Sequence, residues 1–308
     1  MKTARRGLLV NLKSTFIVVE ILRKTIQITL LVLFNSAAFG ISVFPLILPI
    51  LLSSGLPFRV VDEALSVMQN MIYDAIFPFL PLASILIFGI LTGRALCGWA
   101  CPLGLVQDIL AIGKIKKITV SPKTHRSLII LKYVILGLTL LVSISLSLAQ
   151  FSESGRIYRE MLGVFAQAPF TSLSPSDTLF AVLPRFFMNI PFYIYFGFDY
   201  SFLTPLLIAR IIILIVILFL VAYVPRAWCK YLCPQGAFSA LVSRFSLLGL
   251  RRDPVRCVRA RCHICEDACP MKVPILSLPR EKFTDSECIY CLRCVTACPT
   301  KAIKPKFP

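Results

Sequence analysis

Two cysteine runs near the C-terminus have the spacing of an iron–sulfur site. Residues 288–299 read CIYCLRCVTACP, that is Cys-x2-Cys-x2-Cys-x3-Cys-Pro, a run known to ligate [4Fe–4S] clusters. Residues 257–270 read CVRARCHICEDACP, which is the same run with two extra residues after its first cysteine. In such a run three closely spaced thiolates wrap one face of a cubane, and the fourth, before proline, reaches the neighbouring cluster. The two runs therefore predict a domain with two [4Fe–4S] clusters.

This crossed pattern divides the eight tail cysteines into two ligand sets. The first cluster is expected to bind Cys257, Cys262, Cys265 and Cys298, and the second to bind Cys288, Cys291, Cys294 and Cys269. Zinc is the alternative, but it takes four ligands and leaves the third cysteine and the Cys-Pro of each run without a role. The longer first loop makes Cys257 the ligand most in question.

A second cysteine motif occurs twice, as RALCGWACPLG at 94–104 and RAWCKYLCPQG at 226–236. In each copy the two cysteines are four residues apart, so a helix would place them on one face, and a proline then stops that helix. Each copy follows a long apolar segment, so the two halves can be related by a pseudo-twofold axis along the membrane normal. That symmetry would bring four thiols together near the axis. The four are Cys97, Cys101, Cys229 and Cys233.

Three interpretations of these four thiols stay open. They bind a third metal centre or cluster, or they form a thiol redox relay, or they pack and cap helix ends. In the relay, Arg94 and Arg226 would favour the reactive thiolate forms.

The elements that carry the motifs are those of a membrane protein. Hydrophobic residues make up 57% of the 308 residues, and the mean hydropathy is +0.81. A spanning helix needs ~20 mostly apolar residues. Four windows qualify: Thr25 to Phe58, Ala75 to Gly93, Tyr133 to Ser152 and Ser201 to Pro225. Arg210 is the one charge within them, so it is either functional or long enough to reach the interface.

Lys and Arg residues orient these spans, because they stay on the cytoplasmic side. Residues 1–24, 94–132 and 226–308 hold six, seven and fifteen of them, whereas the expected outer loops, 59–74 and 153–200, hold one and three. Both termini are therefore expected in the cytoplasm, with the chain in the inner (cytoplasmic) membrane. The net charge of +18 follows from this topology, so nucleic-acid binding is not needed to explain it. All twelve cysteines lie on the reducing side, which favours metal or redox chemistry over disulfides.

The predicted fold class is thus membrane α-helical. Residues 1–250 are expected to form four transmembrane helices in two pseudo-repeated hairpins, and residues 251–308 a small α+β bacterial-ferredoxin-like domain with two clusters. The segments that follow each motif, LVQDILAIGKIKKI and AFSALVSRFSLLGL, are suited to lie along the inner membrane surface, as is the segment 8–22.

This layout resembles the NapH-like family of membrane ferredoxins, typified by the H subunit of periplasmic nitrate reductase. The resemblance rests on the four spans, on GRALCGWACPLG and PRAWCKYLCPQG, and on the paired tail motifs, and it covers nearly the whole chain. Related cores occur in the regulator NosR and in CcoG, a cytochrome-oxidase assembly protein with cupric-reductase activity. The resemblance implies electron exchange between the quinone pool and a partner oxidoreductase through cytoplasmic clusters.

The expected function is therefore membrane-bound iron–sulfur electron transfer, as a subunit that serves a redox partner protein. The chain has two histidines, both outside the spans, so a bis-histidine haem within them is excluded. Any quinone contact is then expected near the inner boundary, by the motif cysteines, or else the relay across the bilayer belongs to another subunit. Two alternatives remain: a metal-ion (cupric) reductase that uses these thiols, since thiolates select Cu(I), and a redox-sensing regulator. No catalytic residue is identified from the sequence.

Overall fold

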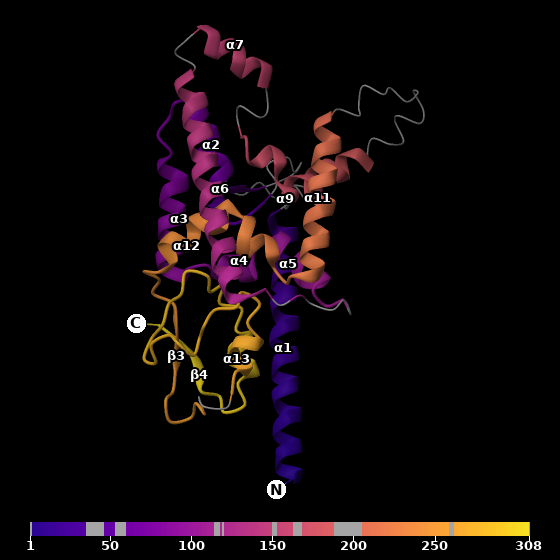
Figure 1. Cartoon of the computed structure of the whole chain (residues 1–308), viewed down its shortest axis with the longest axis vertical. Coiled ribbons are helices and arrows are strands. Elements are labelled where there is room, and N and C mark those ends of the chain that lie inside the picture. Colours follow the sequence, from indigo (N-terminus) through magenta and orange to yellow (C-terminus); the bar gives the residue numbers. More distant parts are fainter. Residues whose placement is uncertain are drawn as a thin grey trace.

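The computed structural model describes residues 2–34, 46–52, 60–113, 118, 120–149, 153–162, 168–187, 205–258 and 262–307. Parts of the first and fourth expected spans, at 35–45, 53–58 and 201–204, lie outside these residues. Figure 1 shows long helices in the upper part of the molecule and a small unit with two strands beside the lower half of the first helix.

Two helices, α6 (Pro122–Ala149) and α11 (Pro205–Tyr223), are long and apolar enough to cross a membrane. A third apolar helix, α3 (Phe79–Thr92), has 14 residues. Their outward faces carry large apolar side chains, such as Leu141 at 62% exposure and Phe219 at 64%. Faces of this kind are costly in water and suit lipid, so the chain is membrane-associated.

The first helix, α1 (Lys2–Phe34), is continuous. The expected surface helix at 8–22 is therefore not a separate element, because no residue within α1 interrupts the helix before the first apolar window begins at Thr25.

Each cysteine motif forms two short helices. In the first copy these are α4 (Ala95–Trp99) and α5 (Pro102–Leu110); in the second they are η5 (Trp228–Leu232) and α12 (Pro234–Ser243). The second cysteine of each copy, Cys101 or Cys233, has an extended backbone and caps the helix that follows. The prolines thus begin a helix as well as ending one, because proline is favoured at the first helical position.

The helices after the motifs are interior elements. The side chains of Leu103 and Asp108 in α5 are 1% exposed, and Ala237 and Ala240 in α12 are fully buried. Helix α12 packs against α3 and α6, and α5 packs against α1 and α11. The two helices are thus largely enclosed by protein, while Ile109 of α5 and Leu241 of α12 are exposed by 53% and 49%. Their expected position along the inner membrane surface stays a prediction.

Parts of both expected outer loops turn inward and pack inside the helical unit. In the first half, β1 (Leu46–Leu48) pairs in parallel with β2 (Val61–Glu63), and α2 (Ala64–Tyr73) follows. Between the strands, Leu51 is 3% exposed, and its carbonyl oxygen lies 3.8 Å from the Cys101 sulfur. Non-helical backbone at membrane depth is stable only where protein buries it or where it lines a cavity.

The second half has a corresponding inward segment. This segment follows α7 (Glu153–Leu162) in the chain. It contains η2 (Thr171–Leu173), α9 (Pro175–Asp177) and the π-helical η3 (Thr178–Val182). Ser174 and Ser176 in this segment are at most 1% exposed. α9 and η3 pack against α11.

The C-terminal unit is built on an antiparallel pair, β3 (Gly249–Arg252) and β4 (Ile303–Lys306), with α13 (Ile264–Asp267) and α14 (Arg293–Ala297). Figure 1 shows α4, α5 and α12 between this tail and the long helices, and α14 packs on α1. The tail is therefore packed against both cysteine motifs. A β-carbon at Gly98 would lie 2.3 Å from the Ile289 carbonyl oxygen, so only glycine permits this approach.

We predict that Gly98→Ala separates the tail from the motif helices. The clash with Ile289 must be relieved by backbone movement, at about 1–3 kcal/mol of stability. Gly137→Ala in α6 is the matched control, because a β-carbon there meets nothing within 4 Å and gains up to ~1 kcal/mol of helix propensity. Thermal unfolding in detergent and limited proteolysis of the tail measure both effects. Equal stability and equal tail protection in the two variants would contradict the close packing.

Candidate iron–sulfur sites

The tail cysteines line two cavities, and each cavity receives cysteines from both runs. Site I is lined by Cys257, Cys262, Cys265 and Cys298. Its apolar walls include Val258 and Ile264, and its sulfur at Cys298 accepts a hydrogen bond from the Ala302 N–H at 3.4 Å. These are the four cysteines that the crossed pattern assigns to the first cluster, Cys257 included.

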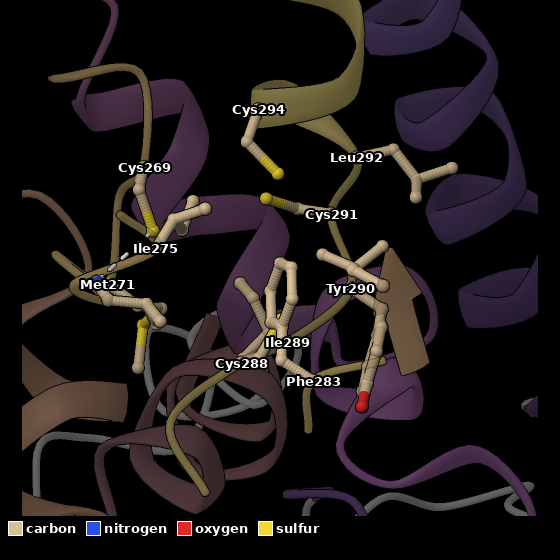
Figure 2. Close-up of a pocket in the computed structure, with 12 residues that line it drawn as sticks. Cys269, Met271, Ile275, Phe283, Cys288, Ile289, Tyr290, Cys291, Leu292 and Cys294 are labelled. Atoms are coloured by element: carbon tan, nitrogen blue, oxygen red, sulfur yellow. Dashed lines mark hydrogen bonds between the residues drawn. The ribbon is translucent and has the colours of Figure 1, made fainter. Parts of the chain in front are cut away.

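Site II is lined by Cys269, Cys288, Cys291 and Cys294. Figure 2 shows the sulfur atoms of Cys291 and Cys294 close to each other, with Cys269 on another side of the cavity. The Cys269 sulfur accepts a hydrogen bond from the Val273 N–H at 3.4 Å, and apolar side chains such as Met271 fill the surroundings. Hydrogen bonds to sulfur and exclusion of solvent are the features that tune an iron–sulfur cluster.

The four motif cysteines meet in a third cavity, site III, between the two halves of the helical unit. Site III is lined by Cys97, Cys101, Cys229 and Cys233, each 4–8% exposed. Two of the sulfurs accept hydrogen bonds: Cys233 from the Gly236 N–H at 3.2 Å, and Cys229 from the Gln107 amide at 3.1 Å. The structure therefore brings together the cysteines that the repeat places near its axis.

The motif arginines cross reciprocally between the two halves. Arg94 donates to the Cys229 carbonyl oxygen at 3.3 Å, and Arg226 donates to the Cys97 carbonyl oxygen at 3.2 Å. Arg94 also explains the motif glycine, because a β-carbon at Gly236 would lie 2.9 Å from its guanidinium. Each arginine thus fixes the cysteine loop of the other repeat, as a pseudo-twofold relation requires.

Burial and the motif arginines act in opposite directions on these thiols. Burial raises the pKa of Cys101 and of Cys233, and the neighbouring thiols raise both further. Arg226 lowers the pKa of Cys101, in the direction expected from the sequence, but the loss of hydration outweighs it. A bound metal centre removes such thiol protons outright.

Two buried carboxylates hold the arginines in place. Asp108 accepts from Arg226 at 3.0 Å and from Arg23 of α1 at 2.8 Å. Glu287, next to Cys288, accepts from Arg94 at 2.9 Å and from Lys132 of α6. The sequence analysis missed both acids. For Asp108 the available signal was a single carboxylate in an otherwise uncharged stretch after the first motif, LVQDIL.

The charges around each acid decide its protonation. Burial raises the pKa of Asp108, but Arg226 and Arg23 more than offset it and hold the pKa at about 2. Burial likewise opposes ionisation of Glu287, and Arg94 and Lys132 lower its pKa below the ordinary value. Both acids are therefore carboxylates at neutral pH.

Site II and site III are in direct contact. The loop between Cys288 and Cys291 lies on the first motif, where the Trp99 indole donates to the Tyr290 carbonyl oxygen at 2.9 Å. Cys97 of site III belongs to the same buried cluster as Ile289 and Cys291. Sites I and II are joined in turn, because each takes one cysteine from the run that supplies the other three to its neighbour. The three cavities therefore follow one another from the tail into the helical unit.

The donor sets fit clusters better than single ions. Each site presents four soft sulfur donors in mostly apolar walls. Within the described ranges, no three Cys, His, Asp or Glu side chains come close enough to hold one metal ion. His263, with its side chain 66% exposed and 3.6 Å from Glu266, is an exposed loop residue.

Comparison with protein families gives the same kind of site. Two models, both described as 4Fe-4S binding domain, match the chain: one at residues 75–119 and 206–253, the other at residues 282–304. The first model covers one copy of the RAxC motif in each of its two segments, and the second covers the last cysteine run. The chain therefore has [4Fe–4S] binding domains.

Several curated proteins are similar to most of the chain. An uncharacterized protein of Methanocaldococcus jannaschii, MJ0750, is 30% identical over 230 residues, which cover 72% of this chain and 76% of the relative. The ferredoxin-type protein NapH of Haemophilus influenzae is 26% identical over 277 residues, or 87% of this chain and 78% of NapH. The methylamine utilization ferredoxin-type protein MauN of Methylobacillus flagellatus is 26% identical over 221 residues, or 70% of this chain and 62% of MauN. No solved structure matches the chain.

We predict that Asp108→Asn strongly destabilises the junction of tail and helices. It leaves Arg226 buried without its counter-charge and Arg23 with Glu20 as its remaining carboxylate, at a cost of about 3–5 kcal/mol. Asp253→Asn is the control, because its pair with Arg256 is partly exposed and contributes under about 1 kcal/mol. Chemical denaturation followed by tryptophan fluorescence compares them. A loss at Asp108 no larger than at Asp253 would show that the buried pairs do not hold the junction.

The pH dependence of the unaltered chain has a defined sign. A depressed carboxylate pKa stabilises the fold above the unfolded value of 3.8 and stops doing so as the pH falls through about 2. The contribution of Asp108 is therefore constant from neutral pH to about pH 4 and is lost below it. The unfolding free energy of the unaltered chain is measured against pH, and the same profile of Asp108→Asn is subtracted from it. The difference isolates the contribution of Asp108. A difference that shrinks already between pH 7 and pH 5 would contradict the assigned ion pairs.

Proposed function

The chain belongs to the NapH-like family of ferredoxin-type membrane proteins, and on that premise we propose that it passes electrons between the quinone pool and a partner oxidoreductase. The family makes it a ferredoxin-type iron–sulfur electron transport protein. The observation that carries the proposal is the succession of three four-cysteine cavities, in which site II touches both site I and site III. Such a succession suits transfer of electrons from one centre to the next.

In this proposal all twelve cysteines are ligands. Site I and site II hold the two tail clusters, with Cys298 and Cys269 exchanged between the runs, and site III holds a third [4Fe–4S] cluster between the repeats. A [4Fe–4S] cluster takes up and releases single electrons at a potential set by nearby charge, hydrogen bonds and solvent exposure. Arg94 and Arg226 place two positive charges beside site III, which favours its reduced, more negative state. The Gln107 and Gly236 hydrogen bonds act in the same direction.

The membrane topology of the proposal follows from charge and helix placement. Four spans, built on α1, α3, α6 and α11, form two hairpins in the inner membrane over residues 1–250. The tail domain at 251–308 and both termini then lie in the cytoplasm, where Lys and Arg are retained. Site III lies at the inner boundary of the bilayer in this arrangement, where a membrane-dissolved quinol would pass electrons to it through the protein that encloses it.

Site I is the exit toward a soluble partner in this arrangement. Cys257 and Cys262 are half-buried, whereas the site III cysteines are buried. The apolar side chains of Val258 and Ile264 at the rim are exposed by 60% and 46%. Residues 226–308, which include the tail, carry fifteen basic and six acidic residues. An acidic redox protein is therefore the partner that fits, since opposite charge steers such docking.

The burial of site III favours electron transfer over metal-ion reduction. A cupric reductase must exchange its ion with solution, and the motif thiols are 4–8% exposed and covered by the tail loop at Ile289 and Tyr290. A redox-sensing regulator would use the same succession of centres. Measured rates of electron transfer distinguish such a regulator from a protein that turns over.

The test is reduction by quinol of the anaerobically purified chain in lipid vesicles. We expect a short-chain quinol to bleach the iron–sulfur absorbance, and the double variant Cys97→Ser/Cys229→Ser to lose this response while dithionite still bleaches its tail clusters. The tail clusters of the variant are its internal control, because their ligands are unchanged. Bleaching of the unaltered chain by dithionite alone would contradict the quinone link.

The crossed ligation makes its own prediction. Cys298→Ser lies in the second run but is expected to remove the site I cluster, so the electron paramagnetic resonance signal of one tail cluster disappears and that of site II remains. Cys269→Ser is the matched variant and removes the site II signal. Loss of the site II signal in Cys298→Ser with site I retained would show that each run holds its own cluster.

A further inference from the structure

A row of buried polar side chains runs outward from site III. Each has at least one side-chain nitrogen or oxygen that is shielded from solvent and has no hydrogen-bond partner among the described residues, and all six residues are at most 6% exposed. The row consists of Trp228, Gln235, Gln69, Thr171, Ser174 and Ser176. Buried groups of this kind are normally satisfied by protein, by ordered water or by a ligand.

Contacts connect the row step by step. Trp228 and Gln235 line site III, and the Trp228 ring stacks on Phe170 with centroids 6.2 Å apart. The Phe170 N–H donates to the Gln69 oxygen at 3.4 Å, which leaves the Gln69 amide nitrogen without a described partner. Thr171 follows Phe170 directly along the chain.

The outer end of the row is an ion pair inside the helical unit. Ser174 caps α9, Ser176 lies within it, and Asp177 at its end is 3.6 Å from Arg210 of α11. Arg210 precedes Tyr223, the inner end of α11, by 13 residues, or about 20 Å at the helical rise. Figure 1 shows α9 beside α11, farther from the tail than α4 and α5. The row therefore crosses much of the membrane thickness.

Most of the row belongs to the second repeat, and Gln69 of α2 is its member from the first half. In the first motif the positions that match Trp228 and Gln235 are Leu96 and Leu103. The inward segment of the first half presents Ile50 to Leu52, which are buried and apolar. Since the first motif forms its two helices with leucine at the matching positions, Trp228 and Gln235 are not needed for the fold of the motif.

We propose that this row holds ordered water and conducts protons between site III and the outer side of the membrane. An enclosed polar space takes up water when each molecule finds two to four polar partners, and the row offers both donors and acceptors. The proposal rests on the proposed oxidation of a quinol beside site III. That step releases one quinone, two electrons and two protons; a cluster held by the site III cysteines would take up the electrons one at a time, and the protons would pass along the water.

This role accounts for the charge in the fourth span. Arg210 is the single charge in the window from Ser201 to Pro225, and it meets Asp177 where the row ends. Intramembrane ionisable groups that pair with one another commonly mark proton or ion pathways.

Radiolytic hydroxyl labelling tests the water directly, because it marks buried side chains that lie next to ordered water. We expect Trp228 to be labelled despite its 6% exposure, and the variant Gln69→Leu/Thr171→Val to lower its labelling severalfold. Ser143→Ala is the control, since Ser143 is equally buried but donates to the Thr139 carbonyl oxygen at 2.9 Å, away from the row. Labelling of Trp228 that is absent, or unchanged in the double variant, would overturn the inference.

Quinol-driven cluster reduction supplies the functional readout in the same three proteins. The rate is expected to fall by about tenfold or more in Gln69→Leu/Thr171→Val, because a positioned proton route contributes at least that much, and to persist in Ser143→Ala. Full bleaching by dithionite in all three shows that the clusters are intact. An unchanged rate of cluster reduction by quinol in the double variant would overturn proton conduction along the row and leave the quinone link in place. No response to quinol in the unaltered chain would overturn the quinone link and, with it, the proton route.

Discussion

The structure depends on two carboxylates that are buried among arginine and lysine side chains. Asp108 joins α5 to the second motif and to α1 through Arg226 and Arg23, and Glu287 joins the tail to the first motif and to α6 through Arg94 and Lys132. A fully buried guanidinium without a counter-charge is strongly unfavourable, so neither acid can be lost without moving its partners. The two networks therefore fix the tail, both repeats and the long helices relative to one another.

The cysteine sites follow from that arrangement. With the arginines held, each reaches the cysteine loop of the opposite repeat, and the four motif thiols close around one cavity. With the tail held, Ile289 and Tyr290 lie on Gly98 and Trp99, so site II comes against site III. In the proposed function, the positive charges that order the loops would also favour the reduced state of a cluster beside them.

The grouping of the cysteines was predictable from sequence. The crossed runs indicate which cysteines share a cavity with Cys298 and with Cys269, and the repeat indicates that the two motifs meet. That these groups ligate clusters stays a prediction. The roles of Asp108 and Glu287 could not be read in this way, since a lone acid acquires its partners only from distant elements. The inward packing of Leu51, in the first apolar window, and of Ser174, in the expected outer loop 153–200, could not be read from sequence. A segment with few charges does not show whether lipid or protein will surround it. Proline after Cys101 and Cys233 marks a helix start as readily as a stop, and tertiary packing decides between them.

The most direct test of the account is the iron and acid-labile sulfide content of the anaerobically purified chain, beside a variant with serine at Cys97, Cys101, Cys229 and Cys233. Three four-iron clusters predict about twelve iron and twelve sulfide per chain, falling to about eight of each in the variant. About eight in both proteins would confine the clusters to the tail and contradict a cluster at site III. Bound zinc with almost no iron would contradict the electron-transfer function itself.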